Sequence, residues 1–206
     1  MSVLGADEMR RVIGSSTRVA TALVISVVLA IGAVPATLGH NNYLHCEYDF
    51  SHMRWAAAAV TYSYPSGWAT SYKNAIDNAA ADFRNNTVFD YNRLSSGATA
   101  PWANWNDPDN LGLAGVTLLA LNHTTCRITD AAFYFNVPHF DPSQGGTNHS
   151  QDQKQCTAVH EFGHGVGLTH VASGSSVMLA DHNARCHNQL IKVLQPEDRN
   201  DINSLY

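Results

Sequence analysis

The chain of 206 residues has a formal net charge of −5 at pH 7, and only 14% of its residues are charged. No run of basic residues appears, so we expect no nucleic-acid partner. The length and a hydrophobic fraction of 45% suit one domain with a substantial core.

The N-terminus has the order of a secretory signal, in which basic residues precede an apolar run and then small residues. The uncharged apolar run covers residues 19–34 and follows Arg10, Arg11 and Arg18. We therefore expect residues 1–39 to be a signal peptide, cleaved after Ala36 or at the end of this segment, and residues 40–206 to be a secreted, extracellular domain. The run is shorter than the roughly 20 residues of a membrane span, so an anchor formed by residues 19–38 is the less favoured alternative.

Residues 40–206 alternate between segments of strand and helix character, with apolar residues at a period of two or of about 3.6. The expected elements, in chain order, are a strand at 60–62, a helix over 69–84, strands over 88–94, 116–119 and 128–137, a helix from 150 to 165 and a short helix from Pro196. We expect a loop over 95–110, where Gly, Pro, Asn and Asp are frequent. This order predicts an α+β domain with a mixed twisted sheet.

The expected helix over 150–165 carries the most informative stretch of the chain. Its last turns contain the pattern H-E-x-x-H-x-x-G-x-x-H, which begins at His160 and ends at His170. Residues four apart share one helix face, so His160 and His164 can bind one ion. Gly167 allows the chain to leave the helix sharply, and His170 then supplies a third ligand. The fourth position stays open, which is typical of a catalytic zinc.

Glu161 lies about 100° around the helix from His160 and should not join the ligand set. We expect it to act as the general base on a zinc-bound water. The competing interpretation is that these histidines are ordinary surface or core residues of a helix. Three glycines, each costing about 1 kcal/mol of helix propensity, argue against a helix built only for stability; they are Gly163, Gly165 and Gly167.

Four cysteines follow the signal, and an even number in an exported domain suggests two disulfides. Three pairings are possible, and we favour Cys156–Cys186 together with Cys46–Cys126. Cys156 precedes His160 by about one helical turn, so its bond would pin the loop after the motif to the helix. A zinc site built from Cys and His is less favoured, because the chain has no C-x-x-C.

The motif resembles the signature of the metzincin zinc endopeptidases, which adds a methionine in a tight turn below the three imidazoles. Met178 follows His170 by eight residues and fits that turn. Within this clan the chain is most similar to the matrixins and to bacterial matrixin-like peptidases. Asp198 lies where those enzymes place an acidic residue that ties the last helix to the domain. The calcium and second-zinc loops of matrixins are not recognisable.

The resemblance implies a zinc-dependent endopeptidase with one catalytic Zn²⁺, acting on protein or peptide substrates. We expect a monomer without stable membrane association once the signal is cleaved. Substrate should pair with an exposed strand edge, for which residues 116–119 are the candidate. A metzincin-fold protein that binds zinc without significant catalysis is the alternative function.

Two further groups of residues carry weaker predictions. Three loop acids can ligate calcium, although solvated acids are the favoured interpretation; they are Asp107, Asp109 and Asp141. The remaining histidines have no usable spacing, and we expect them to be surface or structural residues; they are His40, His45, His52, His123, His139, His149, His182 and His187.

Overall fold

The computed structural model describes residues 25–26 and 53–206. Most of the expected signal segment and Cys46 lie outside the described residues. Among the helices described, none is long and apolar enough to cross a membrane.

A mixed sheet forms the centre of the domain, as the sequence predicts. Its strand order is β1-β5-β6-β4-β2-β3. The pairs β3–β2, β2–β4 and β4–β6 are parallel, whereas β5 is antiparallel to β6. The strands are β1 (Ile25–Ser26), β2 (Ala59–Ser63), β3 (Asp90–Arg93), β4 (Ala100–Trp105), β5 (Gly115–Asn122) and β6 (Arg127–Asn136).

The loop expected over 95–110 is wrong, because it contains β4, a strand inside the sheet. Pro, Asn and Gly around this segment favoured a loop, but burial of alternate side chains outweighs that composition. Ala100 is 0% and Trp102 is 2% exposed. Trp102 pairs with Phe133 of β6, and the two rings lie 5.1 Å apart.

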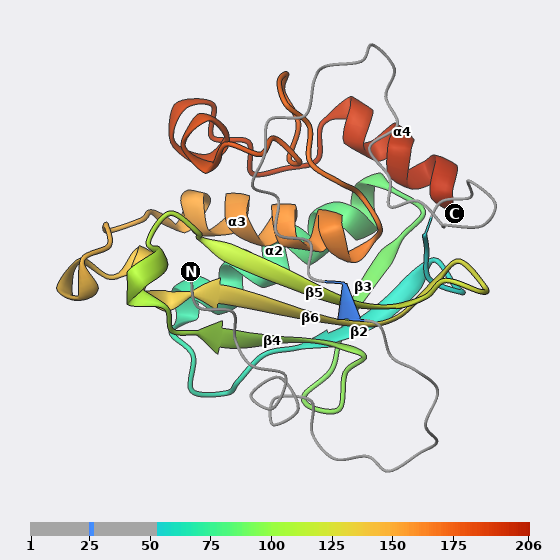
Figure 1. Cartoon of the computed structure of the whole chain (residues 1–206), viewed down its shortest axis with the longest axis horizontal. Coiled ribbons are helices and arrows are strands. Elements are labelled where there is room, and N and C mark those ends of the chain that lie inside the picture. Colours follow the sequence, from blue (N-terminus) through green and yellow to red (C-terminus); the bar gives the residue numbers. More distant parts are fainter. Residues whose placement is uncertain (1–24, 27–52) are drawn as a thin grey trace.

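Two long helices, α2 (Thr70–Asn86) and α3 (Gln151–Gly165), cover one face of this sheet (Figure 1). Aromatic side chains fill the space between the layers. Phe162 of α3 is fully buried, and its ring stacks on Tyr91 of β3 at 3.9 Å and meets Phe133 edge-on at 5.0 Å. These contacts fix α3 over the sheet, and with it the histidine motif.

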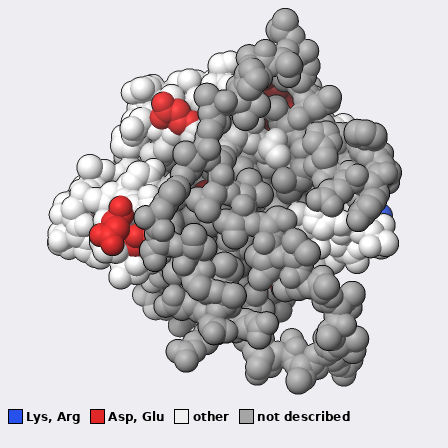
Figure 2. All heavy atoms as spheres, viewed as in Figure 1, with Lys and Arg blue, Asp and Glu red and all other residues white. Residues whose placement is uncertain are grey.

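The chain ends in α4 (Pro196–Leu205), on the far side of α3 from the sheet (Figure 1). Pro occupies the first turn of this helix, where its missing N–H is tolerated. Ile202 and Leu205 bury the apolar side of α4. On the face that Figure 2 shows, the coloured side chains of the described residues are mainly Asp and Glu.

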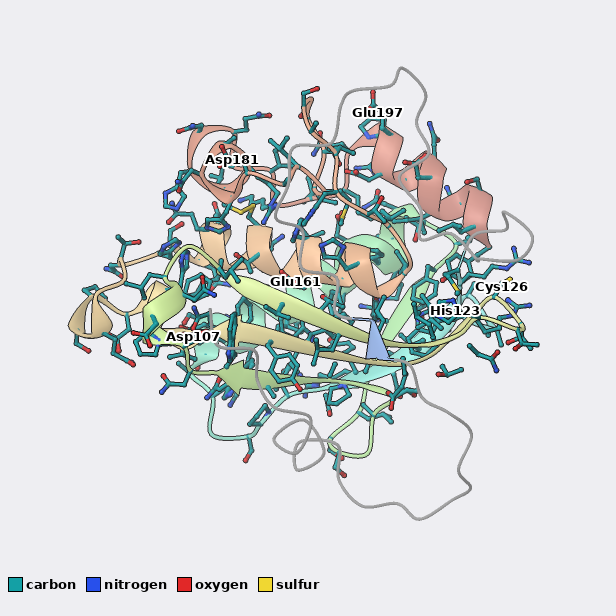
Figure 3. All side chains as sticks on the ribbon, viewed as in Figure 1. Asp107, His123, Cys126, Glu161, Asp181 and Glu197 are labelled. Carbon is teal, nitrogen blue, oxygen red and sulfur yellow. A yellow bond between two sulfur atoms is a disulfide. The ribbon has the colours of Figure 1, made fainter. Side chains whose placement is uncertain are left out.

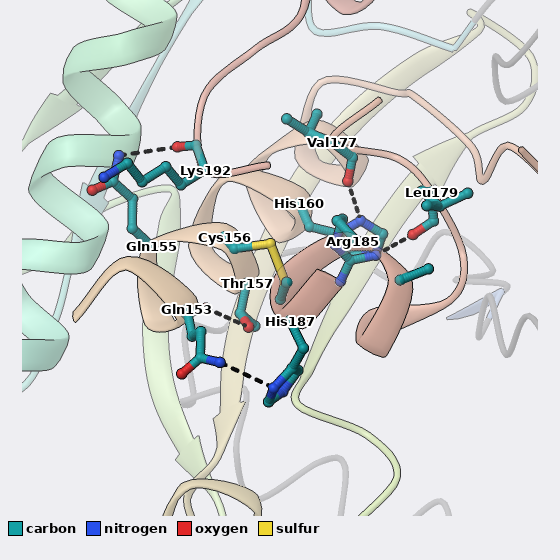
Figure 4. Close-up of a disulfide and its surroundings, with 12 residues drawn as sticks. Gln153, Gln155, Cys156, Thr157, His160, Val177, Leu179, Arg185, His187 and Lys192 are labelled. Atoms are coloured by element: carbon teal, nitrogen blue, oxygen red, sulfur yellow. Dashed lines mark hydrogen bonds between the residues drawn. A yellow bond between two sulfur atoms is a disulfide. The ribbon is translucent and has the colours of Figure 1, made fainter. Parts of the chain in front are cut away.

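The structure contains the favoured disulfide between Cys156 and Cys186 (Figure 4). Cys156 lies in α3, and Cys186 lies in the short π-helical turn η4 (Asn183–Asn188). Both residues are fully buried. Because Cys46 lies outside the described residues, its bond to Cys126 stays a prediction.

We expect the double variant Cys156→Ala/Cys186→Ala to lose about 3 kcal/mol of unfolding free energy. The bond closes a loop with a sequence separation of 30. Opening it raises the conformational entropy of the denatured chain, which lowers the free energy of unfolding by roughly this amount. Urea unfolding with and without a reductant measures the loss. Reductant should lower the stability of the wild type at least to that of the variant, because it also opens the expected Cys46–Cys126 bond. An unchanged midpoint in both would contradict the prediction.

Candidate metal and catalytic site

Helix α3 starts with a capping box that fixes where its first turn begins. The Ser150 hydroxyl accepts a hydrogen bond from Gln153 N at 3.2 Å, and the Gln153 side chain accepts one from Ser150 N at 2.8 Å. Starting from this cap, the 15 residues of α3, about four turns, bring His160, Glu161 and His164 to its C-terminal half.

The structure brings the three motif histidines together with their Nε2 atoms facing one another. His170 Nε2 lies 3.1 Å from His160 Nε2 and 3.1 Å from His164 Nε2. Nδ1 of His160 lies 2.7 Å from the Val177 carbonyl, and Nδ1 of His164 lies 2.9 Å from the Leu168 carbonyl. A carbonyl only accepts, so each of these Nδ1 atoms carries the proton and leaves Nε2 with a lone pair.

These residues fit a zinc ion. Burial holds the pKa of His160 well below its usual value, and lowers the pKa of His164 to about 3 and that of His170 to about 4. The imidazoles are therefore neutral near pH 7, which is the form that binds metal. The backbone carbonyls fix the tautomers of His160 and His164, as partners of zinc-binding histidines usually do.

Gly167 turns the chain so that His170 can return to the helix. Its φ is +102°, a left-handed conformation that favours glycine. Gly167 N donates to the His164 carbonyl at 2.9 Å and Leu168 N donates to the Gly163 carbonyl at 3.0 Å, which closes the end of α3. The sharp exit expected from the motif is present.

Met178 occupies a tight turn packed under the histidine helix. It is 1% exposed, and its backbone N–H donates to Ser176 Oγ at 2.9 Å. The turn is joined to the histidine loop, since Val171 N donates to the Met178 carbonyl at 2.9 Å. A Cβ at Gly163 would collide with the Met178 sulfur, so glycine at this position allows the close approach.

Glu161 lies on the side of α3 that faces β5 (Figure 3). Its side chain is 3% exposed, and Thr117 Oγ1 donates to Glu161 Oε2 at 2.6 Å. Burial raises the pKa of Glu161 to about 7, and the Thr117 hydrogen bond opposes that rise. A Cβ at Gly115 would lie 2.7 Å from Oε1, so the absence of a side chain there leaves room beside this oxygen.

Asp198 ties α4 to the methionine turn. Its carboxylate accepts hydrogen bonds from Ser176 Oγ at 2.6 Å, Val177 N at 3.1 Å and Gln195 N at 2.8 Å. Asp198 is 3% exposed. Because Val177 also supplies the carbonyl that holds His160, this contact connects the last helix to a candidate zinc ligand.

Several residues of the site were not identified from the sequence. Thr117 and Gly115 lie some 45 positions before Glu161 and carry no local signal; only the pairing of β5 beside α3 reveals them. Arg185 is 3% exposed and donates to the Leu179 carbonyl behind the site (Figure 4). Burial lowers the pKa of this guanidinium to about 10, although Glu161 and Asp181 raise it.

Three of the other histidines, which we expected to be surface or structural residues, lie together in a second cluster. His139, His149 and His182 place one ring nitrogen each within 4.8 Å of the others. They are far apart in the sequence, so no spacing revealed them. Both clusters of metal-binding type among the described residues consist of histidines. The calcium prediction gains no support, and Asp141 instead accepts hydrogen bonds from Ser143 and Gln144.

The fold and the metal chemistry of the first cluster define the class of protein, a zinc metallopeptidase. The family model of the matrixins matches residues 54–206, and the chain belongs to this family. It is thus a metalloendopeptidase of the metzincin clan, as the resemblance implied. The solved structure of myroilysin is similar, with a TM-score of 0.50 and 14% identity, over 75% of this chain and 82% of that chain. At this identity the likeness shows the shared fold.

Proposed function

We propose that residues 40–206 form a secreted zinc endopeptidase, in which His160, His164 and His170 hold the zinc ion and Glu161 is the general base. The position of Glu161 carries this proposal. This carboxylate is buried beside three neutral imidazoles and accepts a hydrogen bond from β5. A zinc site with a structural role alone does not require such a carboxylate next to its ligands.

The two oxygens of Glu161 have different surroundings, and this difference suggests their roles. Oε2 accepts the Thr117 hydrogen bond, which orients the carboxylate. Oε1 lies beside Gly115 and is free to take a proton from the attacking water and pass it to the leaving amine. Zinc, when bound, supplies the Lewis acidity that activates the water and polarises the peptide carbonyl.

The edge of β5 is the proposed place for the substrate backbone. In the described part of the chain, the outer side of β5 pairs only with β1, opposite Leu119 and Ala120, and β1 belongs to the segment that we expect to be removed with the signal. The segment from Gly115 to Leu118 therefore offers backbone groups to an added strand. The same segment holds Thr117 beside Glu161, so a peptide on this edge would lie close to the general base.

A peptide library with and without a zinc chelator tests the proposed function. We expect the zinc-loaded domain to cleave internal peptide bonds, the chelator to abolish cleavage, and added Zn²⁺ to restore it. Cleavage that survives complete removal of the metal would contradict the proposal. No cleavage by zinc-loaded protein would favour the alternative of a zinc-binding protein without catalysis.

The N-terminus of the protein recovered from the culture medium tests the proposed export. Cleavage of the signal predicts a chain that begins at residue 37 or 40. An N-terminus at Met1 in the membrane fraction would instead support the anchor formed by residues 19–38.

A further inference from the structure

The second histidine cluster joins three segments that surround the start of α3. His139 lies in the 3-10 turn η2 (Val137–Phe140), His149 immediately precedes the cap of α3, and His182 precedes η4. The rings are packed together, with the His139 ring 4.5 Å from that of His149 and 4.9 Å from that of His182. None of these residues belongs to the H-E-x-x-H motif.

Four ring nitrogens of this cluster are shielded from solvent and have no hydrogen-bond partner within the described part of the chain. They are His139 Nε2, His149 Nδ1, His182 Nδ1 and His182 Nε2. His149 is only 3% exposed. A buried polar atom without a partner costs about 1–3 kcal/mol, and native proteins contain few of them. Such a concentration at one point indicates that a ligand satisfies these atoms.

In His139 and His149 the other ring nitrogen has a hydrogen-bond partner outside the cluster. This contact decides which nitrogen of each ring is available to a ligand. His139 Nδ1 lies 2.6 Å from the Leu111 carbonyl, so it carries the proton and leaves Nε2 with a lone pair. His149 Nε2 lies 2.6 Å from Thr147 Oγ1, which leaves Nδ1 for the cluster. The same type of arrangement, an outer partner on one nitrogen and a lone pair on the other, orients His160 and His164.

We propose that His139, His149 and His182 bind a second zinc ion, separate from the one at the catalytic motif. All three donors lie within 4.8 Å of one another, and Zn–N bonds of about 2.0–2.1 Å would draw the imidazoles somewhat closer together.

The chemistry of the donors favours zinc over calcium or magnesium. The cluster has three imidazoles and no carboxylate, whereas calcium and magnesium select oxygen ligands. Two cations act on the cluster, Arg185 on His182 and Lys154 on His149. They would repel a divalent ion, so the Zn–N bonds of three imidazoles have to outweigh this repulsion.

The proposed ion would connect the N-terminus of α3, through His149, to the segment after the methionine turn, through His182. The Cys156–Cys186 bond also joins α3 to η4, the turn that follows His182. The second ion would therefore brace the loop between His170 and Cys186, with no part in the reaction itself.

Zinc stoichiometry of the full chain tests this inference, measured by native mass spectrometry and elemental analysis after removal of loosely bound metal. We expect two zinc ions per wild-type chain, one in His182→Gln and one in the double variant His160→Gln/His164→Gln. His182 is the preferred position because neither of its nitrogens has a hydrogen-bond partner among the described residues, so its replacement breaks no hydrogen bond seen in that part of the chain.

His187→Gln is the matched control. His187 is exposed, its ring lies 4.9 Å from that of His149, and its Nδ1 contacts Gln153, yet it is outside the cluster and its variant should keep two ions. One zinc per wild-type chain, unchanged in His182→Gln, would overturn the inference, as would a metal-free His160→Gln/His164→Gln chain. The latter variant keeps the test decisive if His182→Gln does not fold. Peptide cleavage is measured separately, so loss of the second ion and failure of the proposed catalysis remain distinguishable.

Discussion

Replacing Glu161 by glutamine should lower kcat/KM for peptide cleavage by about 10²–10⁴-fold, the usual contribution of a general acid–base group. Glutamine has nearly the same shape, and its carbonyl oxygen can still accept the Thr117 hydrogen bond. It cannot take a proton from water near pH 7. The zinc content should stay unchanged, because Glu161 lies beside the three imidazoles and is not one of the ligands proposed.

Cleavage of a fluorogenic peptide, together with zinc analysis of the same samples, measures this effect. Glu197→Gln is a suitable control, since Glu197 is exposed on α4 and its variant should keep full activity. Equal activity of Glu161→Gln and wild type would exclude Glu161 as the base. A variant that loses zinc together with activity would show that the carboxylate serves the metal site instead.

Replacing Asp198 by alanine should reduce the free energy of unfolding by about 4–5 kcal/mol. The change leaves a hydroxyl and two backbone N–H groups without their acceptor, and each buried unsatisfied donor costs about 1–3 kcal/mol. It also leaves a cavity where a side chain was 3% exposed. The methionine turn should loosen, because Ser176 and Val177 lose their anchor on α4.

Urea unfolding followed by circular dichroism gives the size of this loss. Glu197→Ala, one position earlier in the same helical turn and exposed, should change stability by less than about 0.5 kcal/mol. If both variants unfold at the same urea concentration, the carboxylate of Asp198 contributes no more than a surface acid. A second consequence is weaker zinc retention in Asp198→Ala, since Val177 holds His160.

The parts of the fold that the sequence predicted are those with a strong local signal. The helix α2 has apolar residues at helical spacing, and α3 has both a cap and a fixed motif, so their limits agree with the structure within about two residues. The methionine turn was expected from the resemblance to the metzincins, whose signature places a methionine a short distance after the third histidine. In each case the residues that define the element are close neighbours along the chain.

The parts that the sequence missed depend on contacts between distant segments. β4 has loop-like composition, and only its pairing with β6 and β2 makes it a strand. Thr117 reaches Glu161 because β5 lies beside α3, and a lone threonine in an apolar run gives no hint of this. The second histidine cluster is the clearest case: His139 and His182 are 43 positions apart and meet only in the folded chain.

The bond between Cys156 and Cys186 makes the fold sensitive to the redox state of its surroundings. Such bonds persist in oxidising compartments and are rare where thiols are kept reduced. A newly made chain in a reducing compartment lacks the constraint between α3 and η4, and its folded state is correspondingly less favoured. Only the oxidised chain has the covalent bond that joins α3 to the segment after the methionine turn. A chain that stays in a reducing cell interior is therefore the less stable form of this peptidase.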